Sequence, residues 1–281
     1  MLHKVIMKSL VAMVALVAMP ALAEVREDAA ATFQKGKALL AEANFNDALV
    51  SFRTAARFDT GNQEYLQAYS QLVQVIRMRQ DLAKTQDPEK WFSKARALRT
   101  FYYDHLLFEE ALPLDRKIHA ERLAENSAAA LAETLLALGD NAEAAEMLSK
   151  ESSSPRTDVL MGLALAREGR MSEAKTASSK AAVSKNSGPR AFFALARLQA
   201  LIGDSEGAVE ALRKSFELTS PSRLDSLKDE ARQCPDFGAL ASIPAFAEAL
   251  ETGSKVKESG CSKGTSCGGC PHRSTCAGSD H

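Results

Sequence analysis

The chain has 281 residues, of which 46% are hydrophobic and 25% charged, the balance of a folded globular protein. Its 35 Lys and Arg residues against 36 Asp and Glu residues leave a formal net charge of −1, which gives no electrostatic basis for binding nucleic acid or adsorbing to a membrane surface. Aromatic residues make up only 6% of the chain, and this scarcity favours closely packed helices over a β-sandwich or barrel.

Residues 1–23 have the pattern of a secretory signal peptide. Two lysines precede an uncharged apolar run at 10–19, and Ala-Leu-Ala at 21–23 gives the small-x-small pattern that a signal peptidase accepts. The apolar run is too short to cross a bilayer as a permanent anchor. We therefore expect a mature protein that begins at Glu24, has no membrane span and is periplasmic or extracellular. The alternative is an uncleaved N-terminal anchor.

Residues 29–62 carry small and apolar side chains at spacings typical of two helices packed face to face. The pattern lies at Gly36, Leu39, Phe45, Ala48, Phe52, Ala55 and Asp59. This segment resembles the tetratricopeptide repeat (TPR), a helix–turn–helix unit of about 34 residues. Three more copies follow, at Leu131 to Leu148, Gly162 to Ala181 and Phe192 to Leu218.

The small residues of this pattern explain why such units stack. Gly36 and Ala48 would let the two helices of the first unit approach closely, with Phe52 filling the space beside them. Three glycines would end the first helices of the later units: Gly139, Gly169 and Gly203. Since one unit cannot bury its apolar stripe alone, neighbours must stack. The sequence predicts an all-α fold, a right-handed α-solenoid of TPR-like repeats with a flexible Cys-rich tail; the alternative is an unrelated helical bundle.

The resemblance implies an order of parts along the chain. They are a signal peptide at 1–23, a first TPR at 24–62, degenerate or elongated helical repeats at 63–125, three TPR-like repeats at 126–220, a capping segment at 221–251 and a flexible tail at 252–281. The part at 63–125 concentrates aromatic residues, which we interpret as core packing rather than an exposed ligand platform: Trp91, Phe92, Phe101, Tyr102 and Tyr103. The Pro-Asp-Phe frame that begins at Pro235 resembles the segment that closes many bacterial TPR arrays.

No catalytic motif is present in the sequence. It lacks a Gly-x-x-x-x-Gly-Lys-Ser/Thr loop, a Gly-x-Ser-x-Gly elbow and a His-Glu-x-x-His helix. His105 and His119 are the only histidines between the signal peptide and the tail, and neither has a Cys or paired acid at ligand spacing. We therefore expect a non-enzymatic scaffold for protein–protein contacts.

In the TPR family, the first helices of successive repeats line a concave groove, so the resemblance implies a partner site there. The positions that map to this groove are Lys37, Arg156, Arg167, Arg190, Phe193 and Arg197. Their basic and apolar character suits an acidic segment or C-terminal carboxylate of a protein or peptide, held by bidentate arginine contacts. The alternative is that these arginines only make the inner face soluble.

The tail contains four cysteines within 16 residues: Cys261, Cys267, Cys270 and Cys276. Outside the cytoplasm such cysteines form disulfides, here with three possible pairings, whereas converging sulfurs also suit zinc or another soft metal. The Cys-x2-Cys-Pro-x4-Cys element resembles part of the iron–sulfur scaffold ATPases, which implies an iron–sulfur cluster as a third possibility. The alternative function is a metal-binding or redox protein that acts through this tail.

Overall fold

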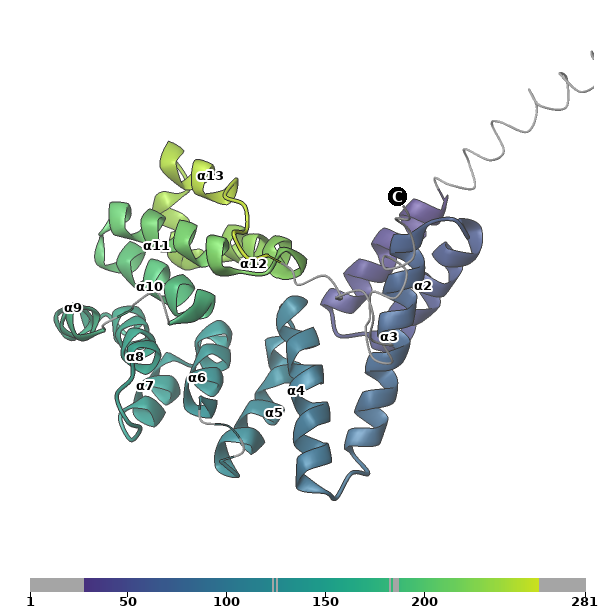
Figure 1. Ribbon diagram of the computed structural model, residues 1–281, viewed down its shortest axis with the longest axis horizontal. Helices are drawn as coiled ribbons and strands as arrows, with labels where there is room; N and C mark the ends of the chain where they lie inside the picture. The colour runs from purple at the N-terminus through teal and green to yellow at the C-terminus, as the bar shows by residue number, and fades with distance from the viewer. Residues whose placement is uncertain (1–27, 123, 125, 182, 184–186, 258–281) are drawn as a thin grey trace, which may run out of the picture. The chain divides into compact units, whose positions relative to one another are not determined.

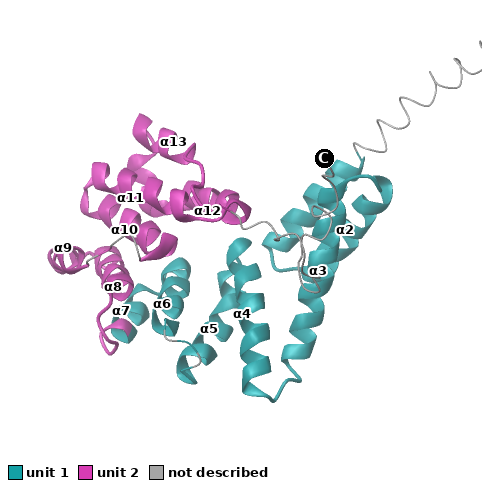
Figure 2. Cartoon of the chain, viewed as in Figure 1, with its two compact units in different colours: residues 1–147 teal, residues 148–281 magenta. Residues whose placement is uncertain are grey.

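The computed structural model describes residues 28–122, 124, 126–181, 183 and 187–257 (Figure 1). Regular structure in these ranges is helical, and helices adjacent in sequence pack in pairs. The predicted all-α architecture of stacked helix pairs is confirmed. Over the same residues, no helix is both long and apolar enough to cross a bilayer. The chain divides into two compact units, residues 1–147 and 148–281, each described by itself below (Figure 2).

Unit 1 begins with a helix at residues 28–41. It continues with α2 (Phe45–Phe58), α3 (Gln63–Leu82), α4 (Pro88–Asp104), α5 (Phe108–Ala120) and α6 (Ser127–Leu138), and α7 (Asn141–Leu148) ends at the boundary of the unit. Unit 2 contains α8 (Pro155–Arg167), α9 (Met171–Lys180), α10 (Gly188–Ile202), α11 (Ser205–Leu218), α12 (Pro221–Gln233), the 3₁₀ helix η1 (Pro235–Leu240) and α13 (Pro244–Leu250).

The ends of these helices follow from local side-chain chemistry. The Asn62 side-chain oxygen accepts a hydrogen bond from the backbone N–H of Glu64 at 3.0 Å and so caps the start of α3. Three helices end at the glycines that the sequence marks, with φ of 87° at Gly139, 78° at Gly169 and 88° at Gly203. This left-handed backbone region favours glycine, so the predicted helix ends are confirmed.

The small residues lie where helices approach most closely. An added Cβ at Gly36 would lie 2.6 Å from ring atoms of Phe52, and one at Gly162 would lie 2.8 Å from Leu198. The predicted alanines of the second helices are fully buried: Ala48, Ala144, Ala174 and Ala208. The spacing read from the sequence therefore reflects close packing, as expected.

The aromatic residues of the 63–125 segment form part of the core of unit 1. The Phe92 ring is half-buried. The other four rings are buried: Trp91, Phe101, Tyr102 and Tyr103. The Arg79 guanidinium lies 4.1 Å from the Phe45 ring centroid and donates to Tyr102 Oη at 2.9 Å and Glu110 Oε2 at 2.6 Å. The interpretation of this cluster as core packing is confirmed.

A buried polar network joins α4, α5 and α6. Asp115 is 1% exposed and accepts hydrogen bonds from Arg99 Nε and from Thr134 Oγ1, the latter at 2.5 Å. The Tyr103 hydroxyl contacts the Thr134 hydroxyl and donates to the Ala130 carbonyl at 3.1 Å. Burial raises the pKa of Asp115 and outweighs the opposing effect of Arg99. This network fixes three successive helices through specific hydrogen bonds.

The closing segment of unit 2 covers the apolar side of the last repeat. The Phe237 ring lies 5.8 Å from that of Phe193 on α10 and 5.6 Å from that of Phe246 on α13. These rings and Leu240 are buried in one core cluster. The segment thus removes from water a helix face that no further repeat covers within the described residues.

Candidate ligand-binding cavity

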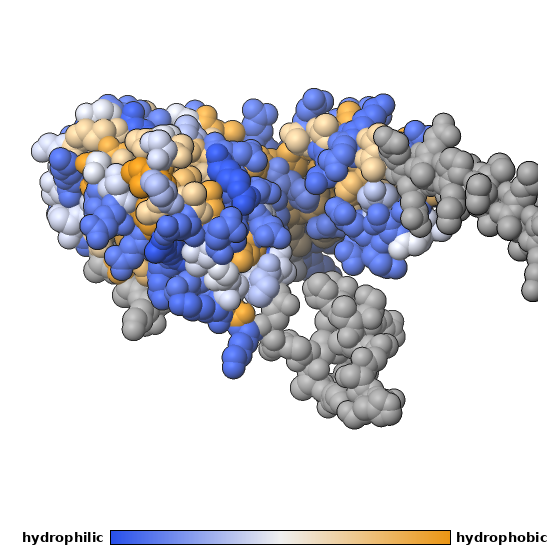
Figure 3. Space-filling view, turned by 90° about the horizontal axis from the view of Figure 1, so that it is seen from above, coloured by the Kyte–Doolittle hydropathy of each residue, from blue (hydrophilic) through white to orange (hydrophobic). Residues whose placement is uncertain are grey.

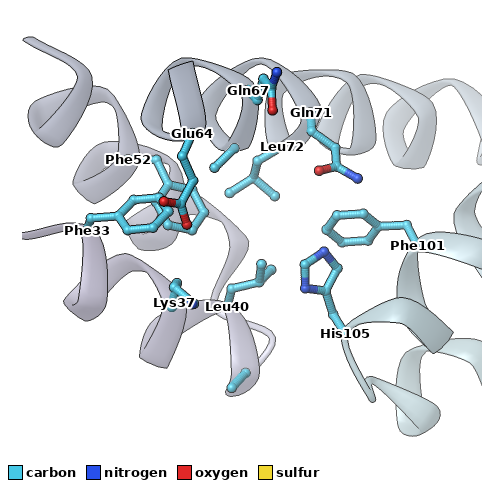
Figure 4. Close-up of a pocket in the computed structure, with 12 residues that line it drawn as sticks. Phe33, Lys37, Leu40, Phe52, Glu64, Gln67, Gln71, Leu72, Phe101 and His105 are labelled. Atoms are coloured by element: carbon cyan, nitrogen blue, oxygen red, sulfur yellow. The ribbon is translucent and has the colours of Figure 1, made fainter. Parts of the chain in front are cut away.

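The clearest concave feature of unit 1 is a cavity of about 300 Å³ (Figure 4). It is lined by Phe33, Lys37, Leu40, Ala41, Phe52, Glu64, Gln67, Ala68, Gln71, Leu72, Phe101 and His105. These residues come from helix 28–41, α2, α3 and the end of α4. Elsewhere on the molecule, Figure 3 shows hydrophilic residues interspersed with apolar ones over the face drawn there. This cavity is the candidate site of unit 1.

Two pairs of rings form opposite walls of the cavity. The Phe33 and Phe52 rings lie 5.2 Å apart, and the Phe101 and His105 rings lie 4.3 Å apart. Figure 4 shows these pairs facing each other, with Leu72 between them on α3. The first wall depends on Gly36, because any larger residue there would displace the Phe52 ring. The cavity thus has an apolar interior that helix packing holds in place.

The mouth of the cavity is polar and nearly balanced in charge. Lys37 is exposed, with its Nζ 5.8 Å from the Phe33 ring centroid. Glu64, Gln67 and Gln71 are exposed along α3. The mouth therefore offers one cation, one anion and two amide groups to a ligand that enters the apolar interior.

His105 is half-buried at the end of α4. Burial holds the pKa of His105 below its ordinary value, and the charge of Lys37 acts in the same direction, against an opposing effect of Asp104. Its imidazole is therefore neutral at neutral pH and offers one donor and one acceptor.

Of the six residues predicted to line a partner groove, Lys37 lies at this cavity, whereas Arg167 and Arg197 bind a carboxylate of the chain itself. Arg167 donates from Nε and Nη2 to the two oxygens of Asp236 at 2.9 and 2.8 Å, and Arg197 donates from Nε to Asp236 Oδ2 at 2.7 Å. Burial alone would raise the pKa of Asp236, but the two guanidinium groups outweigh it and hold that pKa below its ordinary value. The bidentate contact that the sequence suggested for a partner is thus made within unit 2.

Two of the remaining predicted groove residues, Phe193 and Arg190, also make contacts within unit 2. Phe193 is 1% exposed, and its ring packs against that of Phe237 in the core of unit 2. Arg190 donates from Nη1 to Glu230 Oε2 at 2.5 Å. Arg156 is half-buried near the start of α8. Phe193 and Arg190 have these partners because α12 and the closing segment pack onto the face that the repeat pattern left open.

Residues 127–150 and 189–214 match the family model described as tetratricopeptide repeat. The two matched segments are similar to this repeat. They cover α6 with α7 and α10 with most of α11. No curated protein gives a match to the chain. Among solved structures, the crystal structure of a thermophilic TPR protein from Thermus thermophilus is similar at 18% identity, over 73% of this chain and 97% of that chain, with a TM-score of 0.34.

The cysteine cluster of the tail and the predicted signal peptide fall outside the described residues. Within the described ranges, no three His, Cys, Asp or Glu side chains gather at a distance that would hold a metal ion. Cys234 lies there and is half-buried, and its Sγ lies 3.6 Å from Asp236 Oδ2. Burial raises the pKa of its thiol, which disfavours the reactive thiolate.

Of the lining residues, sequence reasoning assigned only Lys37 to a binding site, because seven of the twelve come from residues 63–125, the segment with the least regular repeat pattern. Phe101 was assigned correctly to the core, but not to a cavity wall. His105 carried no motif and was set aside. The signal that was available is the unusual number of glutamines in α3, two of which, Gln67 and Gln71, line the mouth.

Proposed function

We propose that this chain is a non-enzymatic scaffold that binds a segment of a partner protein in the cavity of unit 1. The observation that carries the proposal is the combination of TPR segments with a cavity whose interior is aromatic and whose mouth is polar. TPR repeats are typical of protein-binding scaffolds, and apolar pockets with a few polar groups at their rim are the usual form of binding sites.

The chemistry of the cavity supports binding rather than catalysis. Its described lining contains no serine, threonine or cysteine that could serve as a nucleophile. The carboxylate of Glu64 is exposed, and the imidazole of His105 packs against the Phe101 ring. This lining suits recognition of an apolar group and supports no assignment of a general acid and base.

A photo-crosslinking experiment tests this function. A photoreactive amino acid is placed at Ala41, which lines the cavity, and in a matched variant at Ala38, which is exposed on the same helix outside the lining. We expect a defined protein adduct from position 41 and none from position 38 when each variant is expressed in the source cells. Equal labelling from both positions would refute a specific site.

We also propose that the protein acts outside the cytoplasm. The support is the charged start, apolar run and small-residue cleavage pattern of residues 1–23. N-terminal sequencing of the protein recovered from the exported fraction should begin at Glu24. A sequence that begins at Met1 in the soluble cytoplasmic fraction would contradict this part of the proposal.

The second proposed function is metal binding or redox activity of the tail, supported by the Cys-x5-Cys-x2-Cys-x5-Cys spacing. Metal analysis of the purified mature protein, with thiol counts before and after reduction, distinguishes the possibilities. One bound zinc or iron–sulfur cluster supports the metal form, and two disulfides support a structural role. Four free thiols without metal would refute both.

A further inference from the structure

The glutamines of the chain are concentrated on one helix. Five of the nine lie in α3: Gln63, Gln67, Gln71, Gln74 and Gln80. At about 100° per residue, the first four fall within an arc of about 80° on the helix, and Gln80 falls outside it. All four are exposed. We call this set, residues 63, 67, 71 and 74, the glutamine stripe.

The glutamine stripe runs along the mouth of the cavity. Gln67 and Gln71 line it, and Figure 4 shows the Gln71 amide beside the Phe101 ring. Gln63 and Gln74 extend the same row in both directions along α3. Among the hydrogen bonds of the described residues, none occupies the side-chain amides of the stripe. These amides are therefore available to an external ligand.

The spacing of the stripe matches the main chain of an extended peptide. Residues four apart on a helix are separated by about 6 Å along its axis. Alternate residues of an extended strand are separated by about 6.6 Å. Each glutamine amide presents both a donor and an acceptor, which is what the N–H and C=O of a peptide unit require. A helical ligand would leave the stripe without partners, because its backbone groups are already paired.

The charges at the mouth indicate an uncharged ligand. Lys37 and Glu64 carry opposite charges, so neither an acidic nor a basic segment gains a net attraction. The opposed rings of Phe33 with Phe52 and Phe101 with His105 suit a large apolar side chain. The volume of about 300 Å³ is at the small end for a ligand pocket, which suits one such side chain.

We propose that the cavity binds an extended, uncharged segment of a partner protein, whose main chain is held by Gln67 and Gln71 and whose single large apolar side chain enters between the ring walls. This inference rests on the proposed function and names the chemistry of its partner. It differs from the acidic segment that the sequence suggested, since three of the four groove arginines, Arg167, Arg190 and Arg197, are engaged by Asp236 and Glu230.

The test uses a library of random dodecapeptides displayed on phage and selected on the full mature protein. We expect enriched peptides with one aromatic or large aliphatic residue and no net charge. The most enriched peptide is then synthesised, and its dissociation constant is measured for wild type, for the double variant Gln67→Ala with Gln71→Ala, and for Gln80→Ala. The double variant should bind about tenfold more weakly, since it loses two pairs of hydrogen bonds. Gln80→Ala is the matched control and should bind as wild type.

One further protein variant and one modified peptide test the two parts of the proposal separately. Ala68→Leu adds side-chain volume inside the cavity and should also weaken binding, with thermal melting to show that the fold persists. N-methylation of the peptide backbone on both sides of the apolar residue should weaken binding to wild type, but not further to the double glutamine variant.

The outcomes separate the two proposals. Enrichment of acidic peptides or of a free C-terminal carboxylate would overturn the partner chemistry while leaving a binding scaffold intact. Equal affinity of wild type and the double glutamine variant would overturn the role of the stripe. No enrichment, combined with a protein adduct at position 41, would overturn recognition of a short extended segment. No enrichment and no adduct would overturn the proposed function itself.

Discussion

The contact between Asp236 and two arginines gives the sharpest test of how unit 2 is held together. We predict that Asp236→Asn, which preserves the shape of the side chain and removes its charge, destabilises the protein by about 3 kcal/mol. Asp236 is the carboxylate partner of both Arg167 and Arg197. An asparagine oxygen can accept from one guanidinium, but its amide group faces the other as a second donor.

The magnitude follows from burial. The Arg197 side chain is 6% exposed and that of Asp236 is 5% exposed, whereas Arg167 retains 14%. Removing one member of a buried ion pair costs about 3–5 kcal/mol, because the remaining charge stays uncompensated. Partial exposure of Arg167 places the expected loss at the lower end of this range. For a protein of this size, about 3 kcal/mol corresponds to a fall of about 6–12 °C in the melting temperature.

Urea unfolding followed by circular dichroism measures the loss. The matched control is Asp229→Asn, whose side chain is 60% exposed and pairs with Arg232 three residues on. This variant should stay within about 0.5 kcal/mol of wild type. If the two variants were equally stable, the reasoning from the buried pair would be refuted.

The same contact predicts a dependence on pH. The pKa of Asp236 is lower in the folded protein than its ordinary value, so the folded state binds fewer protons. Its stabilising contribution is therefore fully present above about pH 5 and is lost as the pH falls below about 4. The difference in stability between wild type and Asp236→Asn should shrink over that interval. A constant difference down to about pH 3 would contradict the assigned direction.

Three other changes have expected outcomes that follow from packing. Gly36→Ala places a methyl group against the ring that walls the cavity and should cost about 2 kcal/mol in urea unfolding, whereas Gly61→Ala, with no atom closer than 3.8 Å, should be nearly neutral. Thr134→Val leaves the buried carboxylate of α5 without one of its donors and should cost about 2 kcal/mol by thermal melting, against little change for the exposed Thr100→Val. Truncation after Lys257 should leave the melting temperature of the folded part unchanged, and a fall of several degrees would show that the tail contributes to it.

The helix pairs were predictable because their determinants are local. Gly36 is required where two helices approach most closely, and Gly203 is required where the backbone turns to positive φ. Each requirement concerns a few neighbouring residues and recurs at a fixed interval along the chain. Repetition therefore makes the signal visible in a single sequence.

The environment of the arginines was not predictable in the same way. The repeat pattern places Arg167 and Arg197 on a particular helix face but does not say what covers that face. Their partner, Asp236, lies 69 and 39 residues further along the chain. It arrives there because Phe237 and Phe246 bury their rings against the last repeat. A long-range hydrophobic contact thus decides the partner of the charged groups, and periodicity carries no information about it.

The cavity illustrates a different limit. Phe101 and the residue that follows α4, His105, come from a segment whose register does not follow the repeat. Their aromatic character predicts burial, and Phe101 is buried in the structure. Whether a ring fills the core or leaves space beside it depends on how the neighbouring helices are offset. That offset is a property of packing and has no counterpart in residue type.

The arginines and the glutamine stripe therefore have different roles, and the reason is the cost of desolvating each group. A buried or half-buried guanidinium must be neutralised, so each of four arginines binds an internal carboxylate and holds helices together: Arg79, Arg99, Arg167 and Arg197. An exposed amide costs far less to desolvate and needs no counter-charge, so the glutamine stripe can exchange water for a ligand's main chain at small cost. Substitutions at the arginines should consequently change stability first, and substitutions in the stripe should change binding while leaving stability nearly intact. The chain thus separates the groups that hold its helices together from the groups that we assign to recognition.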